Sequence, residues 1–464
     1  QMPTESPDIT RAIAEYVSNA HIEDFSQETI QAAKAAIIDS FACMLAGSCE
    51  PLAEVFCQYI GEEGGQPTAS IIGKSIKTTT TNAALVNGAM GHALDYDDIT
   101  EVTKTHPTVV LLPAVLALSE ENKSSGMNLL LAYLVGFEVA CSIGVGMSPA
   151  FFDELGWHPT GPLGSVGAGA GAAKILQMEK HKIAMTLSLA ASQGSGLRQN
   201  FGTMTKPFHA GNAARCGVTA ARLVNLGFTA GVDAIEGPFG FMKAFSGGMN
   251  FSPDAVITSL RSTCHMAASG IEIKKYPCCG SAHLALDALL TLVSTNSIDP
   301  MEIANISVLV DFDPPRSLIH RNPKTPLEGK FSMEYCLASG TVDKQVGLDT
   351  FTADKFSRTV VRSLMPKIEM KRIPGNEGKP SWMEGFHQVK VRLNNGEVFS
   401  ERASRTRTGA LRGVTFSEVI HKFEDCASLV IAREELPELT TLLMNLEDVP
   451  DINQLTSRMN RSAN

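Results

Sequence analysis

The first 265 or so residues carry one apolar segment after another at the spacing of an α-helix. In the segment SQETIQAAKAAIIDSFACMLAG, Ser26 is the expected N-cap and Gly47 the expected helix end. The segments TNAALVNGAMGHALDYDD and HPTVVLLPAVLALSEEN follow the same pattern. Alanine and glycine recur on faces that would otherwise carry bulky side chains, which permits close packing of neighbouring helices. The pattern predicts a mainly α protein with a large all-helical domain.

The pattern changes near residue 267, where strand-like segments begin. NISVLVDFD and QVKVRL alternate apolar and polar residues with β-branched side chains, and the second runs into Asn394-Asn395-Gly396, a hairpin signal. Two segments between them, FSMEYCLASGTVD and TADKFSRTVVRSLM, are predicted to be helices. Residues 267–403 are therefore expected to form a smaller α+β domain.

From Thr415 the chain turns helical again. We expect residues 404–464 to return to the helical domain formed by residues 1–266. The segment KRIPGNEGKPSW combines proline, glycine and charge, so it is predicted to be a mobile loop.

The formal net charge of the 464-residue chain is -10 at pH 7. An acidic protein repels the phosphates of nucleic acids and of anionic membranes, so neither partner is expected. An anionic small molecule is compatible with this balance, but it needs a locally basic pocket. With 44% hydrophobic and 19% charged residues, the chain is expected to bury a large core.

The ten cysteines form no recognisable disulfide framework, because most lie in apolar segments where a reduced thiol serves as a small hydrophobe. The opening segment QMPTESPDIT lacks the basic and apolar runs of a secretory signal. The longest apolar segments, such as TVVLLPAVLALS, are interpreted as too short to span a bilayer. A reduced cytoplasmic location is the prediction.

The first candidate site is GHALDYDD (91–98), followed by Thr105-His106-Pro107. Three carboxylates within four residues repel one another unless something uses or neutralises them. Either Asp95 orients a nearby His or Lys while His106 enters the same pocket, or the segment is a solvated acidic turn. The Asp-x-Asp-Asp spacing can suit Mg²⁺, but no second carboxylate cluster or phosphate-binding loop accompanies it, so no metal is expected.

The second candidate is GWHPTGPLGS, which leads into SVGAGAGAAKIL. The glycine spacing imitates a dinucleotide-binding fingerprint, but no strand precedes it, so a closely packed helix is the better interpretation. His158 lies in a Gly/Pro-bounded loop before that helix, where an imidazole and backbone N–H groups can both meet an anion. The alternative is an ordinary surface histidine.

Three further segments carry cations or a phenol. RQNFGTMTKPFHAGNAAR places Arg198, Lys206 and His209 between two apolar helices, where they form either a cradle for carboxylates or an ordinary basic loop. KKYPCCGSAH, with Lys274 and His283, lies at the expected domain boundary, where clefts form. In KFSMEYC, Tyr335 is either a proton or hydrogen-bond donor or a core residue.

These five motifs occur in the order seen across the MmgE/PrpD family, and the chain resembles that family over nearly its whole length. The resemblance implies a large helical domain with an α+β lid, a homodimer, and an active site in the cleft with no metal or organic cofactor. The family includes 2-methylcitrate dehydratase, cis-aconitate decarboxylase and iminodisuccinate epimerase. Matched motif by motif, its pocket residues correspond to Asp95, His106, His158, Lys206, Lys274 and Tyr335, with His209 and His283 in matching motifs.

The resemblance implies removal of a proton from a carbon beside a carboxylate of a small di- or tricarboxylate. Lys206, Lys274 and Arg198 suit stabilisation of the developing charge. His158 and His106 suit acid–base work, and Asp95 would fix a tautomer or hold a neighbouring base.

Two departures bear on the reaction. The dehydratase and decarboxylase branches commonly have Thr directly after the acidic cluster, where this chain has Ile99, and the stretch from Asp95 to His106 is one residue longer. LRQNFGTMTKPFHAGNAAR and FSMEYC look more like the epimerase branch. We therefore expect an epimerase of the iminodisuccinate epimerase type. The alternatives are a tricarboxylate dehydratase or decarboxylase and a non-catalytic carboxylate-binding protein.

Overall fold

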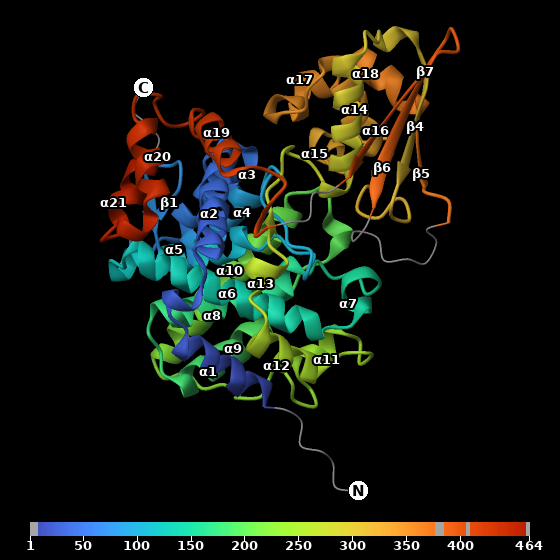
Figure 1. The fold of residues 1–464 in the computed structure, drawn as a ribbon. Coiled ribbons are helices and arrows are strands. Elements are labelled where there is room, and N and C mark those ends of the chain that lie inside the picture. The colour runs from blue at the N-terminus through green and yellow to red at the C-terminus, as the bar shows by residue number, and fades with distance from the viewer. Residues whose placement is uncertain (1–7, 376–384, 405–408, 461–464) are drawn as a thin grey trace, which may run out of the picture.

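A computed structural model describes residues 8–375, 385–404 and 409–460. Figure 1 shows two bodies, a large helical one that holds both ends of the described chain and a smaller one with a twisted sheet. The helices of the large body are α1 (Ile9–Asn19), α2 (Gln27–Gly47), α3 (Pro51–Glu63), α4 (Thr80–His92), α5 (Thr108–Asn122), α6 (Gly126–Gly146), α7 (Pro149–Asp153), α8 (Thr160–Ile175), α9 (Lys180–Gln193), α10 (Thr205–Asn225), α11 (Phe241–Phe245), α12 (Pro253–Ser262), α13 (His265–Ala268), α19 (Phe416–Ala427), α20 (Leu436–Met444) and α21 (Asn453–Thr456).

Local sequence signals set the helix limits as expected. The Ser26 side chain accepts the backbone N–H of Thr29 at the start of α2, which ends at Gly47. Close packing explains the small residues: a Cβ added to Gly217 of α10 would lie 2.5 Å from the Cβ of Ala168 in α8. The fingerprint-like glycines of α8 also serve helix packing, as predicted, since a Cβ added to Gly169 would lie 3.0 Å from the Cβ of Ala190 in α9.

Two helices correct the expectation that no apolar segment is long enough for a bilayer. By length and composition alone, α2 and α6 match a membrane span, with 21 residues each. In both, 89% of the apolar window is buried inside the protein. In this fold, α2 packs against α4 and α19, and α6 packs against α8 and α12.

The large body is not all-helical, which corrects a second expectation. β1 (Ala69–Ile71) and β2 (Ile76–Thr78) form an antiparallel hairpin, and β3 (Ile271–Glu272) pairs in parallel with β8 (Leu411–Arg412). The Glu120 carboxylate supports the hairpin by accepting the backbone N–H of Ser70 at 2.8 Å. Strands of two or three residues are too short to produce a readable alternation, so the sequence pattern did not indicate them.

The smaller body, which we call the lid, is α+β as expected. Its four-stranded sheet has the order β5 (Ile368–Arg372), β4 (Ile303–Val310), β6 (Phe386–Leu393) and β7 (Val398–Ser404), with β4 parallel to β5 and antiparallel to β6. The hairpin between β6 and β7 turns at Gly396, whose φ of 90° favours glycine, so that prediction is confirmed. Its elements are α14 (His283–Thr295), β4 (Ile303–Val310), α15 (Pro326–Gly329), α16 (Met333–Asp343), α17 (Ala353–Phe356), α18 (Thr359–Leu364), β5 (Ile368–Arg372), β6 (Phe386–Leu393) and β7 (Val398–Ser404).

One predicted lid helix is divided. TADKFSRTVVRSLM forms α17 and α18 rather than a single helix, because Arg358 between them has extended backbone angles. The predicted loop KRIPGNEGKPSW lies mostly outside the described residues.

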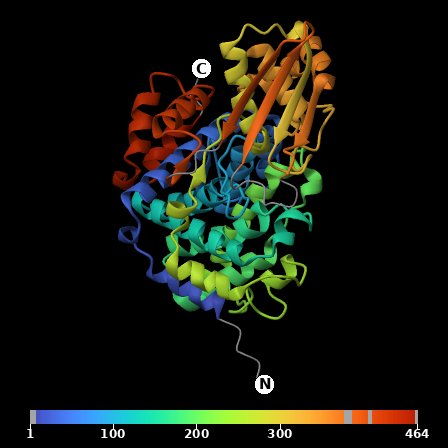
Figure 2. The ribbon, with the colours of Figure 1, turned by 45° about the vertical axis from the view of Figure 1, so that its right-hand side comes forward.

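Each body has its own buried core. The larger core takes side chains from Ile9 to Ile273 and from Ala410 to Met459, and the lid core takes side chains from Cys278 to Leu393. Residues 267–273 therefore pack with the large body rather than with the lid. Figures 1 and 2 show the C-terminal helices on the large body, where α19 packs against α2.

Candidate functional site

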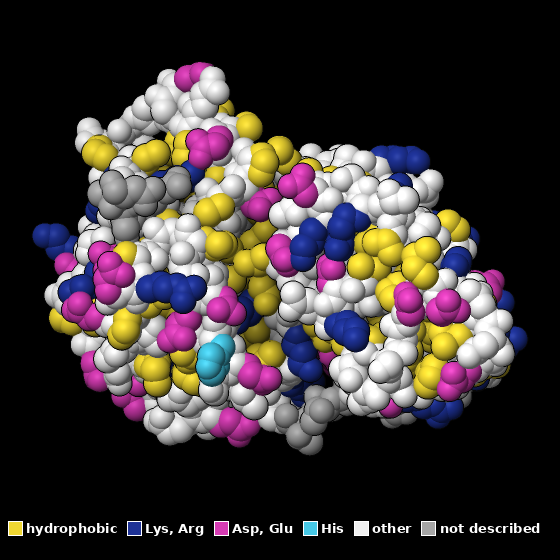
Figure 3. All heavy atoms as spheres, turned by 90° about the horizontal axis from the view of Figure 1, so that it is seen from above, with side chains coloured by type: hydrophobic (Ala, Val, Ile, Leu, Met, Phe, Trp, Pro, Cys, Tyr) yellow, Lys and Arg dark blue, Asp and Glu magenta, His cyan; other side chains and the backbone are white. Residues whose placement is uncertain are grey.

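A cavity of about 990 Å³ lies between the large body and the lid. Figure 3 shows this molecule from above, with a hollow that has hydrophobic side chains in its floor and with acidic and basic side chains interspersed around it. The lid contributes Phe312, Arg316 and Phe331 to the cavity lining. Among the residues singled out from the sequence, those that line it are Asp95, His106, His158, Arg198, Lys206 and Lys274.

Asp95 is the counterion of two buried lysines. It follows α4 in a loop, Lys206 lies in the first turn of α10, and Lys274 follows β3. Lys206 Nζ donates to Asp95 Oδ1, and Lys274 Nζ lies 3.1 Å from Asp95 Oδ2. Burial would raise the pKa of Asp95, but Lys206 and then Lys274 hold it well below its ordinary value. The three groups therefore carry one net positive charge.

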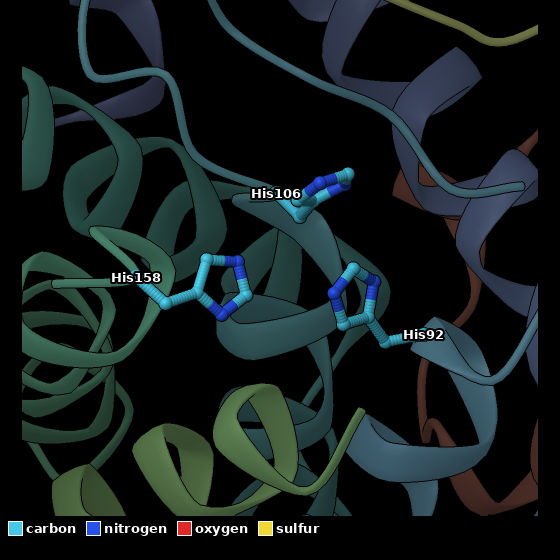
Figure 4. Close-up of side chains that lie close together, drawn as sticks. All are labelled: His92, His106 and His158. Atoms are coloured by element: carbon cyan, nitrogen blue, oxygen red, sulfur yellow. The ribbon is translucent and has the colours of Figure 1, made fainter. Parts of the chain in front are cut away.

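Asp97 joins two imidazoles, of which His106 lines the cavity and His92 is buried behind it. It lies 2.9 Å from Nδ1 of His92, at the end of α4, and 3.1 Å from Nδ1 of His106, which precedes α5. Figure 4 shows the rings of His92, His106 and His158 facing one another from three different segments. The ring centroids of His92 and His106 are 4.4 Å apart.

Burial favours the neutral form of the two imidazoles beside Asp97. Burial lowers the pKa of His106 to about 3 and the pKa of His92 below its ordinary value, although Asp97 opposes both shifts. Burial would raise the pKa of Asp97, yet its two histidine neighbours hold it well below its usual range. A carboxylate at Nδ1 favours the tautomer with its proton on that nitrogen. Nε2 of His92, whose Nδ1 is hydrogen-bonded to Asp97, is thus left with a lone pair. Nε2 of His106 lies 3.9 Å from Asp95 Oδ1.

The imidazole of His158 contacts that of a second histidine, His209, on the side away from the cavity. Nδ1 of His158 lies 3.0 Å from Nδ1 of His209, a residue that does not line the cavity. The backbone N–H of His158 donates to the carbonyl of Gly196. Burial, followed by the charge of Lys206, lowers the pKa of His158 well below its ordinary value. Burial also lowers the pKa of His209 to about 4. His209 therefore positions His158 rather than facing the cavity.

The third carboxylate of the acidic cluster has a structural task. Asp98 accepts the backbone N–H of Thr108 at 3.3 Å and also the hydroxyl of that residue, at the start of α5. Burial raises the pKa of Asp98 well above its ordinary value, and Asp39 adds to the shift. The repulsion expected among the three acids is met by lysines at Asp95, by imidazoles at Asp97, and at Asp98 by a raised pKa, which favours the uncharged form.

Three half-buried cations line the cavity farther from Asp95. Lys104 Nζ binds both oxygens of Asp153 at 2.8 Å. Arg198 Nη1 donates to the carbonyl of Phe152 at 3.0 Å, so this described contact leaves its charge uncompensated. Arg316 of the lid also lies on the cavity wall. Arg198 therefore suits a second carboxylate of a ligand held by the two lysines.

The imidazoles of His92, His106 and His158 offer donor atoms within 4.8 Å of one another. Such a spacing can suit a transition metal. The positive charge of Lys206 lowers the pKa of all three imidazoles. The same charge repels a divalent cation at this position. That the site uses no metal stays a prediction.

Tyr335 and His283 lie outside this cavity, which corrects two expectations. Tyr335 is fully buried in the lid core, where its hydroxyl donates to the carbonyl of Thr350 at 2.5 Å. His283 donates through Nε2 to the carbonyl of Cys278 at 3.0 Å and lines a separate cavity of about 300 Å³. A motif places a residue in the neighbourhood of a site, but packing decides which way its side chain points.

Sequence reasoning missed His92 and Asp97 as site residues. The signal was present in GHALDYDD, since a histidine in the last turn of a helix can reach an acid five residues later. It also missed Phe201 and Phe331, whose ring centroids lie 5.1 Å and 4.9 Å from Lys206 Nζ and favour its positive charge. Nothing in their spacing pointed to that contact.

The chain belongs to the MmgE/PrpD family: residues 11–254 match the MmgE/PrpD N-terminal domain and residues 276–447 the MmgE/PrpD C-terminal domain. The cis-aconitate decarboxylase of Homo sapiens is 27% identical over 459 residues, which cover 97% of this chain and 94% of that protein. Those of Mus musculus and Aspergillus terreus are each 26% identical, cover 97% of this chain, and are themselves covered over 92% and 96% of their lengths. These relatives favour the lyase alternative over the epimerase that the sequence motifs suggested.

Proposed function

We propose that this protein is a lyase that acts on a small tricarboxylate, of the cis-aconitate decarboxylase or 2-methylcitrate dehydratase type. The observation that carries the proposal is the convergence of Lys206, Lys274, His106 and His158 around Asp95 on one cavity. The names of the relatives support a tricarboxylate rather than a dicarboxylate. A homodimer stays a prediction from the family resemblance.

Lys206 and Lys274 hold the carboxylate next to the reacting carbon and stabilise negative charge that develops there. Their ammonium groups are fixed before the reaction by Asp95, so little reorganisation is needed. Arg198 takes a more distant carboxylate of the same substrate. Two anchored carboxylates fix the position of the carbon between them.

His106 and His158 exchange the proton. In a decarboxylation, the bond from carbon to one carboxylate breaks, CO₂ leaves, and the electron pair stays on the carbon skeleton, which then takes a proton from an imidazolium. In a dehydration, a neutral imidazole removes the proton beside a carboxylate, and a second group protonates the departing hydroxyl. Both routes pass through negative charge beside a carboxylate, which the lysines meet.

Burial lowers the pKa of both imidazoles, which favours the neutral base over the protonated acid. A bound trianion compensates the lysine charges and raises the pKa of His106 and His158. One of them then takes up a proton together with the substrate.

The test is a panel of di- and tricarboxylates incubated with the protein in D₂O and followed by ¹H NMR and CO₂ release. Loss of CO₂ or water from a tricarboxylate is the expected result. Exchange of a substrate hydrogen with inversion and without loss of a group would instead identify an epimerase. That reaction is the second candidate because Ile99 lines the cavity where a Thr is common in the lyase branches. Saturable binding without exchange or loss across the panel would identify a carboxylate-binding protein.

A further inference from the structure

The loop that carries Asp95 is held in an unusual backbone shape. Asp95 has a φ of 51°, in the left-handed region that only a few per cent of non-glycine residues occupy, Asp more often than most. Three consecutive carbonyls of this loop each accept a hydrogen bond from a different lysine. Lys330 donates to Leu94 at 2.8 Å, Lys274 to Asp95 at 2.9 Å and Lys422 to Tyr96 at 2.7 Å.

Lys330 belongs to the lid and reaches across to the large body. Its Nζ donates to the carbonyls of both Leu94 and Pro277 at 2.8 Å, and it lies 4.4 Å from the ring centroid of Phe351. The side chain is 96% buried, since only 4% of its surface is exposed. Burial lowers the pKa of Lys330 to about 8, with the charge of Glu50 opposing the shift. One ammonium thus joins the lid, the segment between the two bodies and the loop of Asp95.

Lys422 reaches the same loop from α19. Its Nζ lies 2.6 Å from Asp39 of α2, and it donates to the carbonyls of Tyr96 at 2.7 Å and Lys274 at 3.0 Å. It therefore fixes the backbone of two residues that flank the site, Lys274 itself and the neighbour of Asp95. Neither Lys330 nor Lys422 lines the cavity.

Burying a lysine is costly unless its charge and its donors find partners. The hydrogen bonds of Lys330 go to neutral carbonyls, so the arrangement costs stability that an apolar side chain would not. Lys330 therefore does not serve stability. Its role is better explained by the backbone geometry that its hydrogen bond imposes on the loop of Asp95. The same holds for Lys422, whose ion pair with Asp39 is fully inside the protein.

We propose that Lys330 and Lys422 are positioning residues that hold residues 94–96 in the one backbone shape in which the Asp95 carboxylate meets Lys206 and Lys274. Lys330 makes this shape depend on the lid, and Lys422 makes it depend on α19. The kinetic part of the proposal rests on the proposed function. The structural part, the immobility of the loop, does not.

The test compares Lys330→Met and Lys422→Met with Lys34→Met. Lys34 is a matched control, because it is equally buried on α2 and its Nζ lies 2.9 Å from Glu447, away from the Asp95 loop. Lys422→Met and Lys34→Met should lose stability, since each leaves a carboxylate without its ammonium, whereas Lys330→Met should lose little or none. Only Lys330→Met and Lys422→Met are expected to lower kcat, by about tenfold to a hundredfold, since a displacement of about 1 Å at a reacting group has effects of this size.

A double variant separates stability from positioning. Asp39→Asn combined with Lys422→Met removes both buried charges and should recover much of the lost stability. It should leave kcat as low as in Lys422→Met alone, whereas Lys422→Arg, which keeps a donor and a charge, should recover part of kcat. If kcat instead returns with stability in the double variant, Lys422 is merely structural and the proposal for it is wrong.

Amide hydrogen exchange supplies a readout that needs no substrate. Exchange in the peptide covering residues 92–98 should rise about tenfold in Lys330→Met and Lys422→Met and stay unchanged in Lys34→Met. Unchanged exchange in the first two would overturn the positioning proposal, even if the protein turns over a tricarboxylate. Raised exchange in a protein that turns over no polycarboxylate would support the positioning of residues 94–96 by Lys330 and Lys422 and would refute only the proposed function.

Discussion

Asp95→Asn is the substitution that tests the charge balance of the site most directly. It removes the carboxylate shared by two buried ammonium groups and keeps the side-chain shape. At 3.1 Å and an effective dielectric constant of about 20, the pair of Asp95 and Lys274 alone is worth about 5 kcal/mol. The asparagine amide oxygen can still accept a hydrogen bond. We therefore expect a net loss of about 3–5 kcal/mol in the free energy of unfolding, the range seen when one partner of a buried pair is removed.

The same substitution has an opposite effect on anion binding. Two ammonium groups and one carboxylate carry one net positive charge, and loss of the carboxylate raises it to two. Tricarballylate, a saturated tricarboxylate, should accordingly stabilise Asp95→Asn more than the unsubstituted protein, and KM should fall or stay level while kcat falls. Urea unfolding followed by circular dichroism, with and without tricarballylate, measures both effects.

Asp287→Asn is the control for this experiment. Asp287 is a lid carboxylate that lies 3.6 Å from Lys275, is 29% exposed, and does not line the cavity that holds Asp95. It should change stability by less than about 1 kcal/mol, and tricarballylate should act on it as on the unsubstituted protein. If Asp95→Asn is as stable as Asp287→Asn and gains nothing extra from tricarballylate, then Asp95 is not the counterion described above.

His158→Gln and Lys206→Met should each lower turnover by two or more orders of magnitude with little change in circular dichroism, and near-normal turnover in both would refute the site. Gly196→Ala should lower kcat, since its φ of 135° resists a side chain and an added Cβ would lie 3.1 Å from the ring of His209; an unchanged kcat would show that this backing is unimportant. Burial raises the pKa of Glu138 from 4.5 to about 7, so the folded protein keeps a proton that the unfolded chain loses. Stability should then fall by about 3 kcal/mol as the pH rises from 4.5 to 7, and Glu138→Gln should abolish this slope in urea unfolding at a series of pH values.

The sequence predicted features that depend on local chemistry. Ser26 caps α2 because its side chain meets an N–H three residues on, and Gly396 turns the β6–β7 hairpin because its backbone is free to adopt a positive φ. The motif around Asp95 was also recognisable, since clustered acids need partners. Such features are set by residues within a few positions of one another.

The sequence did not predict features that depend on distant segments. Tyr335 faces the lid core because Phe351 and Phe356, well beyond its own helix, pack against it at ring-centroid distances of 5.7 Å and 4.9 Å. The hydrogen bonds from Lys330 and Lys422 to residues 94–96 could not be predicted for the same reason. No sequence motif marks the carbonyls that these two lysines bind. Side-chain direction at such positions is decided by tertiary packing, which spacing along the chain does not encode.

The contact between Lys422 and Tyr96 has a consequence for the order in which the protein is made. The two residues are 326 positions apart. At the usual pace of synthesis, about 5–20 residues per second, roughly 15–65 s pass on the ribosome between the two. Before α19 is made, the growing chain comes to contain Asp95, His106, His158 and Lys206, but nothing yet holds the loop from the side of α19. The nascent protein is therefore inactive until its last helices arrive, so premature termination before α19 should yield chains that cannot turn over a substrate.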